Sequence, residues 1–488
     1  ISSGAFDKVP AGHMTKEYKI LVAGSFRKTS EILEVFSPYD KSLVGVTYLA
    51  GHNEADEAVK GATEAFDVLK NLPAHKRAGI LEEIVNGITK IAEEFAVTIA
   101  LEAGKPVTEA RAEVKRAINT FRIAAEEAKR MHGEVLPLDI AEGSEKRTGI
   151  VKRFPIGPVL AITPFNFPLN LAAHKVAPAI ACGCPVIVKP ADKTPLSAIM
   201  LGRVINDSGL PQGGISVLPC SIPVAEGLVI DKRMKKLTFT GSPEVGWMLK
   251  GKVPGKKVTL ELGGNAGVII NEDADIEFAA KRCVSGGFAY AGQVCISVQR
   301  IFVQTRVFED FKEKLVANVK ALRLGDPLDD STQVGPMISE AALKRAGDWV
   351  KEAVEAGAVI LIGGKRKQGG IFEPTVLANV RPSMKVCSGE VFAPIVTIEP
   401  FGDFFEAVRA VNDSNYGLQA GVFTRDIKKI FYAYENIEAG GVIINDVPSF
   451  RVDSMPYGGV KQSGCGREGV RYAMEEMTEP RLLVLNLS

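Results

Sequence analysis

The stretch GPVLAITPFNFPLNLAAHKVAPAIACGCPVIVKP, residues 157–190, decides the fold class of this chain. Its pattern predicts a buried strand over 157–163, a helix over 169–181 and a second buried strand over 185–189. Strands that alternate with helices of this length pair in parallel. The stretch therefore predicts one unit of a parallel, doubly wound sheet.

The same alternation continues on both sides of this stretch. Upstream, helices are expected from about Glu54, over 77–103 and over 107–131. Downstream, a first series of strands and helices runs to residue 246, and a second starts after Gly263 with a strand over 267–270 and helices over 276–290 and 307–321. The two series predict two α/β domains that meet near residues 255–265.

Two further segments are typical of strands that need partners. Residues 133–140 and 148–155 flank a polar stretch and predict a two-stranded ribbon, while residues 481–487 form an apolar tail. Unpaired edges of this kind favour association, so we expect a homodimer or homotetramer in which another subunit supplies a strand. Residues 1–13 end in Gly-His before Met14 and are interpreted as the remnant of an expression tag.

Composition excludes several classes of function. The chain has 488 residues and a net charge of +1, which gives no bulk attraction to nucleic acid or anionic lipid, and no apolar run is long enough to span a membrane. The seven cysteines are scattered without CxxC spacing, and the five histidines lack metal-ligand spacing. We therefore expect a cytoplasmic protein with no disulfide framework and no metal.

Cys295 is the candidate nucleophile. It ends the stretch Tyr290-Ala-Gly-Gln-Val-Cys295 after a predicted helix, and the nearby glycines permit close approach of a ligand. A thiolate adds readily to a carbonyl, and a helix end and a cationic cofactor ring would lower the pKa of the thiol. The alternative is a cysteine that only fills space in the core.

Two other side chains fit the chemistry of a carbonyl substrate. Glu261 lies in an apolar strand that ends in Gly-Gly, where burial should raise its pKa and suit it to act as a general base. Asn166 follows a buried strand between two prolines that stiffen the turn, so its amide could serve an oxyanion hole. A solvent-facing edge charge and an Asx turn are the purely structural roles that these two residues could have instead.

Two strand ends could hold a nucleotide. The stretch 237–246 predicts a strand, a turn at Gly241-Ser242 and a helix through Gly246, whose free N–H groups would face a phosphate. Lys189 and Asp192 follow another strand and could bond a ribose. A plain strand–turn–helix connection and a surface ion pair would explain the same residues without a ligand.

Seven blocks, in order, give the chain a family resemblance. They are PFNFP (164–168), VIVKP (186–190), FTGSPEVG (239–246), ELGG (261–264), GQVC (292–295), EVFAP (390–394) and GGVKQSGCGREG (458–469). The sequence resembles the aldehyde dehydrogenase superfamily over essentially its whole length after Met14. The implied fold is α/β, with two doubly wound, Rossmann-like parallel-sheet domains plus a small β-ribbon for oligomerisation. The resemblance assigns a cofactor-binding domain to 14–136 and 156–258, a catalytic domain to 259–461, and the ribbon and tail to 137–155 and 475–488.

The resemblance also implies a role for each block. The nucleophile would be Cys295 and the general base Glu261, with Asn166 and the Cys295 N–H as the oxyanion hole. Further residues are implied in cofactor binding or in a proton relay: Lys189, Asp192, Gly241, Ser242, Gly246, Glu390 and Phe392 for the cofactor, Lys175 and Glu468 for the relay. The block 457–469 is expected to be structural. The reaction would pass through a thioester on Cys295, hydrolysed by water that Glu261 activates.

Cofactor and substrate are less determined by the sequence. An acid at Asp192 would repel a 2′-phosphate, which favours NAD+ without excluding NADP+. The resemblance is strongest to the lactaldehyde, succinate-semialdehyde and non-phosphorylating glyceraldehyde-3-phosphate branches. His174 and Val294 stand where the latter two commonly have Arg, so a small polar aldehyde, lactaldehyde first, is expected.

Different substrates and activities stay open. Arg111 and Arg451 could still bind an anionic aldehyde, such as succinate semialdehyde, glyceraldehyde-3-phosphate or phosphonoacetaldehyde, unless they are only surface and loop residues. The chain could also be a CoA-acylating semialdehyde dehydrogenase, against which Glu261 argues, or a non-catalytic nucleotide-binding protein of the same fold.

Overall fold

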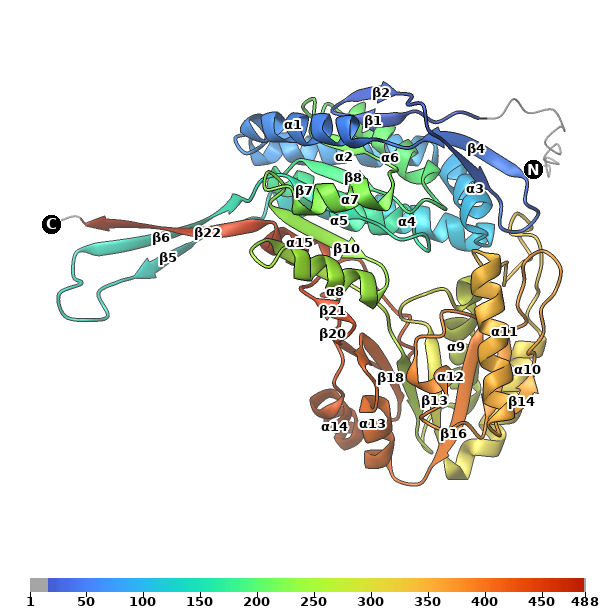
Figure 1. Ribbon diagram of the computed structural model, residues 1–488. Helices are drawn as coiled ribbons and strands as arrows, with labels where there is room; N and C mark the ends of the chain where they lie inside the picture. The colour runs from blue at the N-terminus through green and yellow to red at the C-terminus, as the bar shows by residue number, and fades with distance from the viewer. Residues whose placement is uncertain (1–15, 487–488) are drawn as a thin grey trace, which may run out of the picture.

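The computed structural model describes residues 16–486, which form two α/β halves and a projecting arm (Figure 1). The expected tag remnant at 1–13 lies outside the described residues. Within residues 16–486, no helix is both long and apolar enough to cross a membrane. The α/β class and the parallel sheets in two domains agree with the sequence prediction.

The first sheet has eight strands in the order β2-β1-β9-β8-β7-β10-β11-β21. Their bounds are Ser25–Arg27, Ile20–Val22, Ile215–Val217, Val186–Lys189, Val159–Ile162, Lys236–Thr240, Lys257–Glu261 and Gly464–Cys465. The strands from β9 to β11 are parallel. The chain steps from β7 to β9 in one direction and from β10 to β11 in the other, so the order reverses between β7 and β10. A parallel sheet forms a ligand crevice at such a point, beyond the carboxyl ends of its strands.

One of the helices that the sequence predicts in this half is interrupted in the structure. The helices of this half are α1 (His52–Leu69), α2 (Ala74–Lys90), α3 (Ala92–Ala103), α4 (Val107–Ala128), α5 (Asn170–Cys182), α6 (Leu196–Asn206), α7 (Ile222–Ile230), α8 (Pro243–Lys252) and α15 (Val470–Glu476). The single helix expected over 77–103 is wrong, because the backbone leaves the helical region at Ile91, with φ −118° and ψ 28°. Neither proline nor glycine marks this break, so nothing in the local sequence signals it.

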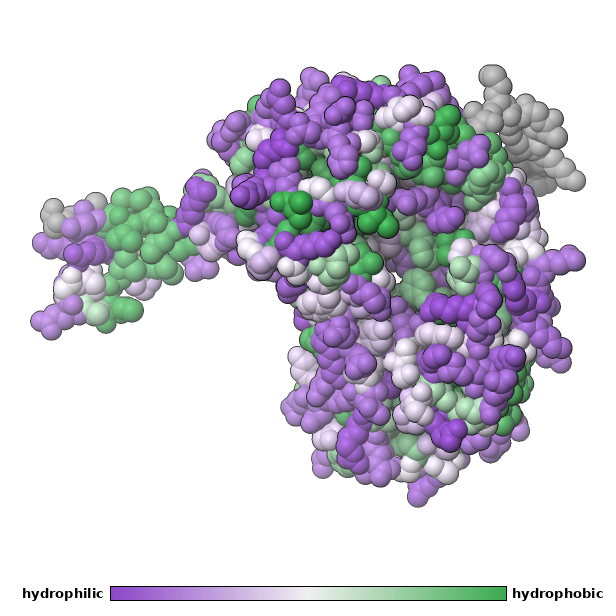
Figure 2. Space-filling view, viewed as in Figure 1, coloured by the Kyte–Doolittle hydropathy of each residue, from purple (hydrophilic) through white to green (hydrophobic). Residues whose placement is uncertain are grey.

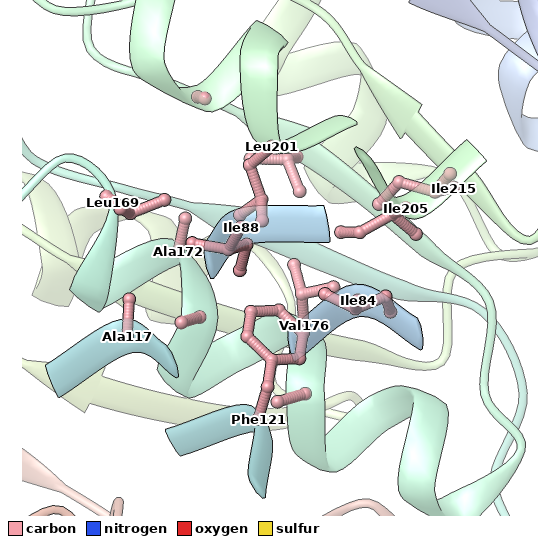
Figure 3. Packing of buried hydrophobic residues seen from close by; sticks show 14 of the residues in the cluster. Ile84, Ile88, Ala117, Phe121, Leu169, Ala172, Val176, Leu201, Ile205 and Ile215 are labelled. Atoms are coloured by element: carbon pink, nitrogen blue, oxygen red, sulfur yellow. The ribbon is translucent and has the colours of Figure 1, made fainter. Parts of the chain in front are cut away.

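Packing between α4 and α5 fixes a helix that carries site residues. Phe121 and Ala117 of α4 lie against Ala172 and Val176 of α5, and all four are fully buried (Figure 3). Burial of side chains such as Phe and Val stabilises the fold by about 1.5–3 kcal/mol each. Because α5 is buried along its whole length, its polar residues are held in fixed positions.

The second sheet has seven strands in the order β14-β15-β16-β13-β12-β18-β19. Their bounds are Val359–Ile362, Thr375–Ala378, Ile395–Phe401, Val298–Gln304, Ala266–Ile270, Gln419–Phe423 and Gly441–Ile444. The helices of this half are α9 (Ile276–Phe288), α10 (Phe308–Lys320), α11 (Glu340–Glu355), α12 (Lys385–Ser388), α13 (Phe404–Asn412) and α14 (Ile427–Asn436). Because β11 pairs with β10 through Glu261, residues 259–261 belong to the first sheet. The chain therefore crosses between the sheets slightly after the expected boundary at 258.

The arm is a three-stranded sheet in the order β22-β6-β5, which projects away from both halves (Figure 1). Its strands are β5 (Glu134–Pro137), β6 (Arg147–Pro155) and β22 (Thr478–Asn486). The sequence predicts a partner strand for both the ribbon and the tail, and within the chain each supplies the partner of the other. They pair with each other in antiparallel register from Thr478 opposite Pro155 to Asn486 opposite Arg147. The smaller two-stranded pairs are β3 (Ile32–Phe36) with β4 (Leu43–Tyr48), and β17 (Tyr416–Gly417) with β20 (Val460–Lys461).

Candidate active site

The Asn166 turn follows β7, at the point where the strand order of the first sheet reverses. Asn166 is buried, and its Nδ2 donates to the carbonyl of Gln293 at 3.0 Å. An amide nitrogen has two hydrogens, so one remains for a second acceptor. The bond therefore joins the turn to the loop that carries Cys295, two residues after Gln293.

Cys295 is half-buried, and its Sγ lies 3.0 Å from the hydroxyl of Tyr457. The loop before it includes Tyr290 and Ala291, both in the left-handed region with φ of 46° and 53°. Such angles are costly for residues other than glycine and persist only where the surroundings impose them. The sequence analysis interpreted the block 457–469 as structural, and it missed the contact of Tyr457 with the sulfur.

Burial dominates the pKa of the Cys295 thiol. It raises this pKa to about 11, and the Tyr457 hydroxyl and the Arg451 charge oppose that increase. Loss of water around the sulfur outweighs these favourable neighbours. The lowering expected from a cationic cofactor ring stays a prediction. Any activation of this thiol therefore needs a further positive charge or a general base.

Glu261 ends β11 with both carboxyl oxygens buried and without a hydrogen-bond partner in residues 16–486. Burial, followed by the negative charge of Glu468, raises the pKa of Glu261 well above its usual value. The charge of Glu261 also contributes to the raised pKa of the Cys295 thiol. A carboxyl group with a raised pKa is suited to accept a proton from water.

Two cations contact the buried Glu468. Lys175 on α5 donates to Glu468 at 2.8 Å and to the Thr238 hydroxyl at 3.1 Å, and Arg451 lies 3.2 Å from the second oxygen of Glu468. Although burial alone would raise it, the pKa of Glu468 is lowered to about 2 by Lys175 and Arg451. Glu468 is therefore an anion at neutral pH and disfavours a second charge on Glu261.

Arg451 joins this cluster to Tyr457, which contacts Cys295. Its guanidinium lies 3.6 Å from the centre of the Tyr457 ring, and its side chain is 6% exposed. His174 lies 3.4 Å from Arg451 and 2.8 Å from Asp453, and Asp453 is 2.7 Å from Arg116 on α4. The sequence analysis singled out Arg451 but missed Arg116 and Asp453, because α4 carries many charges and nothing in its pattern distinguishes Arg116.

Arg111, the other arginine proposed for substrate, does not belong to this cluster. It lies on the exposed face of α4, where it pairs with Glu93 at 2.6 Å and with Asp330. Its side chain is 43% exposed. Arg111 is therefore an exposed helix arginine held in surface ion pairs, which is the structural role that the sequence left open for it.

The residues proposed for a nucleotide lie at the carboxyl ends of β8 and β10. The Ser242 hydroxyl accepts from Val245 N at 3.4 Å and caps α8, and Lys189 lies 2.7 Å from Asp192. A Cβ added at Gly241 would lie 2.6 Å from the Phe239 ring, and one at Gly246 would lie 2.5 Å from Leu262. Both glycines therefore allow close packing at the start of α8.

Glu390 and Phe392 come from the second half and approach the same crevice. Glu390 accepts from Gly264 N at 2.9 Å, and burial raises its pKa to about 7. Phe392, in the left-handed region with φ of 48°, packs edge-on against Phe165 of the Asn166 turn, with ring centres 5.9 Å apart. The two halves thus meet at the Asn166 turn and at the loop that carries Cys295.

Comparisons with known proteins identify the family of this chain. The model of the aldehyde dehydrogenase family matches residues 26–483. A 3-sulfolactaldehyde dehydrogenase from Priestia aryabhattai is 45% identical over 474 residues, covering 97% of this chain and 98% of the relative. Two solved structures are similar. Aldehyde dehydrogenase 21 from Physcomitrella patens, in complex with the reaction product succinate, has a TM-score of 0.96 and 46% identity over 97% of this chain and 99% of that one. A glyceraldehyde-3-phosphate dehydrogenase, GapN, from Methanocaldococcus jannaschii, complexed with NADP, has a TM-score of 0.90 and 40% identity over 94% and 99%. The chain therefore belongs to the aldehyde dehydrogenase family.

Proposed function

We propose that this chain uses NAD(P)+ to oxidise a small aldehyde with an anionic group at its far end, a sulfonate or a carboxylate. One observation carries the proposal: the buried Arg451 lies against Tyr457, whose hydroxyl contacts the Cys295 sulfur. The Nε of Arg451 has no partner in residues 16–486. A guanidinium with a free donor next to the nucleophile suits an anionic group on the substrate.

Fixed charges near Arg451 support this substrate class. Three cations and two carboxylates form the cluster: Arg116, Lys175, Arg451, Asp453 and Glu468. Glu261 is left out of this count because its raised pKa disfavours its charge, and His174 is left out because burial lowers its pKa. The cluster then carries an excess of one positive charge, which an anionic substrate would balance.

This proposal replaces lactaldehyde as the first choice of substrate. The absence of Arg at position 174 argued against succinate semialdehyde, but here His174 holds Asp453 and Arg451, and Arg116 supplies a second guanidinium. The relatives support the same class, since 3-sulfolactaldehyde and succinate, named for two of them, both carry an anionic group.

The mechanism proposed here uses the residues around the sulfur. The Cys295 thiol first gives up its proton to water, and the thiolate then adds to the aldehyde carbon. The Asn166 amide, with the Cys295 N–H, stabilises the resulting oxyanion. Loss of a hydride leaves a thioester on Cys295. Glu261 then takes a proton from water, which attacks the thioester and releases the acid. Glu468, an anion that accepts a hydrogen bond from Lys175 at 2.8 Å, would receive the proton that leaves Glu261.

A nicotinamide cofactor fits the crevice between the halves. The capped start of α8 offers backbone N–H groups to a pyrophosphate, Lys189 and Asp192 would hold a ribose, and Glu390 and Phe392 would face the nicotinamide end. The cofactor, when bound, accepts the hydride. The carboxylate of Asp192 favours NAD+, because it repels a 2′-phosphate.

Removing the guanidiniums tests the substrate class. In Arg451→Leu and Arg116→Leu variants, kcat/KM for 3-sulfolactaldehyde or succinate semialdehyde is expected to fall about 10- to 100-fold, since each lost charge-assisted hydrogen bond is worth roughly 1.5–3 kcal/mol. The value for lactaldehyde, which has no anionic group, should change by less than about threefold. Steady-state assays at the absorbance of the reduced cofactor measure both.

Arg111→Leu is the matched control, because Arg111 lies on the same helix as Arg116 but outside the cluster. It should leave all substrates unaffected. An equal loss for lactaldehyde and for the anionic aldehydes in the Arg116 variant would contradict the assignment.

The arm supports a second proposal, that the chain forms a homo-oligomer. Figure 2 shows apolar side chains gathered on the arm, and Val135, Leu482, Leu483 and Val484 are among its exposed residues. An apolar patch on a projecting sheet is typical of a protein–protein interface. Because β22 already pairs with β6, the partner would cover the arm's face or add to an edge instead of completing the ribbon.

A charge placed on the arm tests this proposal. Leu483→Lys is expected to convert the oligomer into smaller species in sedimentation-velocity runs, since a buried unpaired lysine is costly at an interface. Phe431→Lys, at an exposed apolar residue of α14, is the control and should keep the wild-type size. A monomeric wild-type protein would rule the proposal out.

A further inference from the structure

Lys105 is a buried cation behind the proposed active site. It lies in the short turn between α3 and α4, after Gly104, whose φ is 67°. Its side chain is fully buried, and its ammonium pairs with Glu113 on α4. The reaction scheme above leaves this ion pair without a role.

The Lys105 ammonium lies between two aromatic rings. It is 3.7 Å from the centre of the Phe167 ring and 4.7 Å from that of Tyr290. Phe167 is the residue after Asn166, and Tyr290 begins the left-handed stretch that leads to Cys295. One cation therefore contacts the oxyanion turn and the nucleophile loop at the same time, and desolvated cation–π contacts are attractive.

Hydrogen bonds from α3 and α4 fix the same two segments. The second oxygen of Glu113 accepts from Leu169 N at 3.0 Å and from Asn170 N at 3.1 Å, at the end of the Asn166 turn. Glu109 accepts from Tyr290 N at 3.2 Å. The Tyr290 hydroxyl donates to the carbonyl of Ala103, two residues before Lys105, at 2.7 Å.

We propose that Lys105 is a positioning residue that acts through Asn166: with Glu113, it holds the Asn166 turn against the nucleophile loop, so that the amide stays directed at the developing oxyanion. This inference rests on the proposed function. A donor stabilises an oxyanion effectively only when it is already in position, because the free energy needed to move it would otherwise offset the stabilisation. If the ion pair had a purely structural role, its removal would lower the stability of the fold, and this effect would be the same with or without Asn166.

A double-mutant cycle distinguishes the two roles. Lys105→Met keeps the length of the side chain without its charge, and it is expected to lower kcat by roughly 100-fold, as the loss of an oxyanion donor does. KM should change by less than about threefold. In an Asn166→Ala background, where no amide remains to be positioned, Lys105→Met should lower kcat by no more than about twofold. If the two losses multiply, the inference is overturned.

Two further variants keep the test valid if Lys105→Met folds poorly. Phe167→Leu removes one ring but leaves the ion pair, and it should give a smaller kcat loss that also disappears in the Asn166→Ala background. Glu102→Gln is the control, because Glu102 is an equally buried carboxylate that accepts from Leu196 N and Ser197 N at α6. It should lower the melting temperature and leave kcat near wild type. A wild-type protein without aldehyde-dependent turnover would refute the proposed function, whereas active wild type with multiplicative losses refutes only this inference.

Discussion

Cys295→Ala is expected to lower aldehyde-dependent NAD(P)H formation by roughly 10⁴-fold or more, because removal of a covalent nucleophile leaves only binding and the oxyanion donors. The measurement is absorbance of the reduced cofactor with a panel of small aldehydes against NAD+ and NADP+. Cys465→Ala is the matched control, because Cys465 is the other half-buried cysteine. Cys465 lies on β21, where its sulfur contacts Lys250 of α8. The control variant should retain activity.

The same thiol should show a steep pH dependence when no cofactor is bound. Its pKa is raised to about 11, so the reactive thiolate is scarce at neutral pH, and alkylation by iodoacetamide should accelerate about tenfold per pH unit up to that value. If NAD+ binds as proposed, with its positive charge near the sulfur, its addition should move the profile to lower pH. Mass spectrometry of the alkylated peptide identifies Cys295. A profile centred near pH 8.5 without cofactor would contradict the effect of burial.

Glu261→Gln is expected to give a burst without turnover. Hydride loss does not need this carboxylate, so one equivalent of NAD(P)H per active site should form rapidly. Hydrolysis of the thioester should then be slower by about 10²–10⁴-fold, the usual contribution of a general base. Stopped-flow absorbance gives the burst, and intact-protein mass spectrometry should detect the acyl group on the enzyme.

The pH dependence of hydrolysis supplies a second readout. Glu261 accepts protons only when ionised, and its pKa is raised, so wild-type hydrolysis should increase with pH through that pKa. This increase should be absent from the Gln variant. Glu399→Gln, at a partly buried carboxylate that accepts from Val380 N, is the control and should turn over normally. If the Gln variant gives no burst, Glu261 acts before hydride loss and the assignment to hydrolysis is contradicted. Efficient transfer of the acyl group to added CoA would support a CoA-acylating activity instead.

The strands and helices near residues 157–190 were predicted closely, because their apolar patterns depend on local burial. The predicted strands over 157–163 and 185–189 correspond to β7 and β8, and the predicted helix over 169–181 corresponds to α5. The break at Ile91 was missed, because a change in backbone direction there depends on packing between helices and not on residue type. The partner of the tail was also missed, since residues 147–155 and 478–486 are far apart in the sequence and pair only in the folded chain.

For the site, sequence blocks identified the candidates Cys295, Glu261 and Asn166, and the parallel fold that carries them. Only the tertiary structure decided which charges surround these residues. Arg116 and Arg111 lie on one helix with similar neighbours in sequence, yet one reaches the buried cluster and the other faces solvent. The sign of the pKa shift at Cys295 was likewise decided by burial. The loss of water around a group and its distances to other charges are properties of the folded protein. Both depend on residues that are far apart in the sequence and come together only when the chain folds.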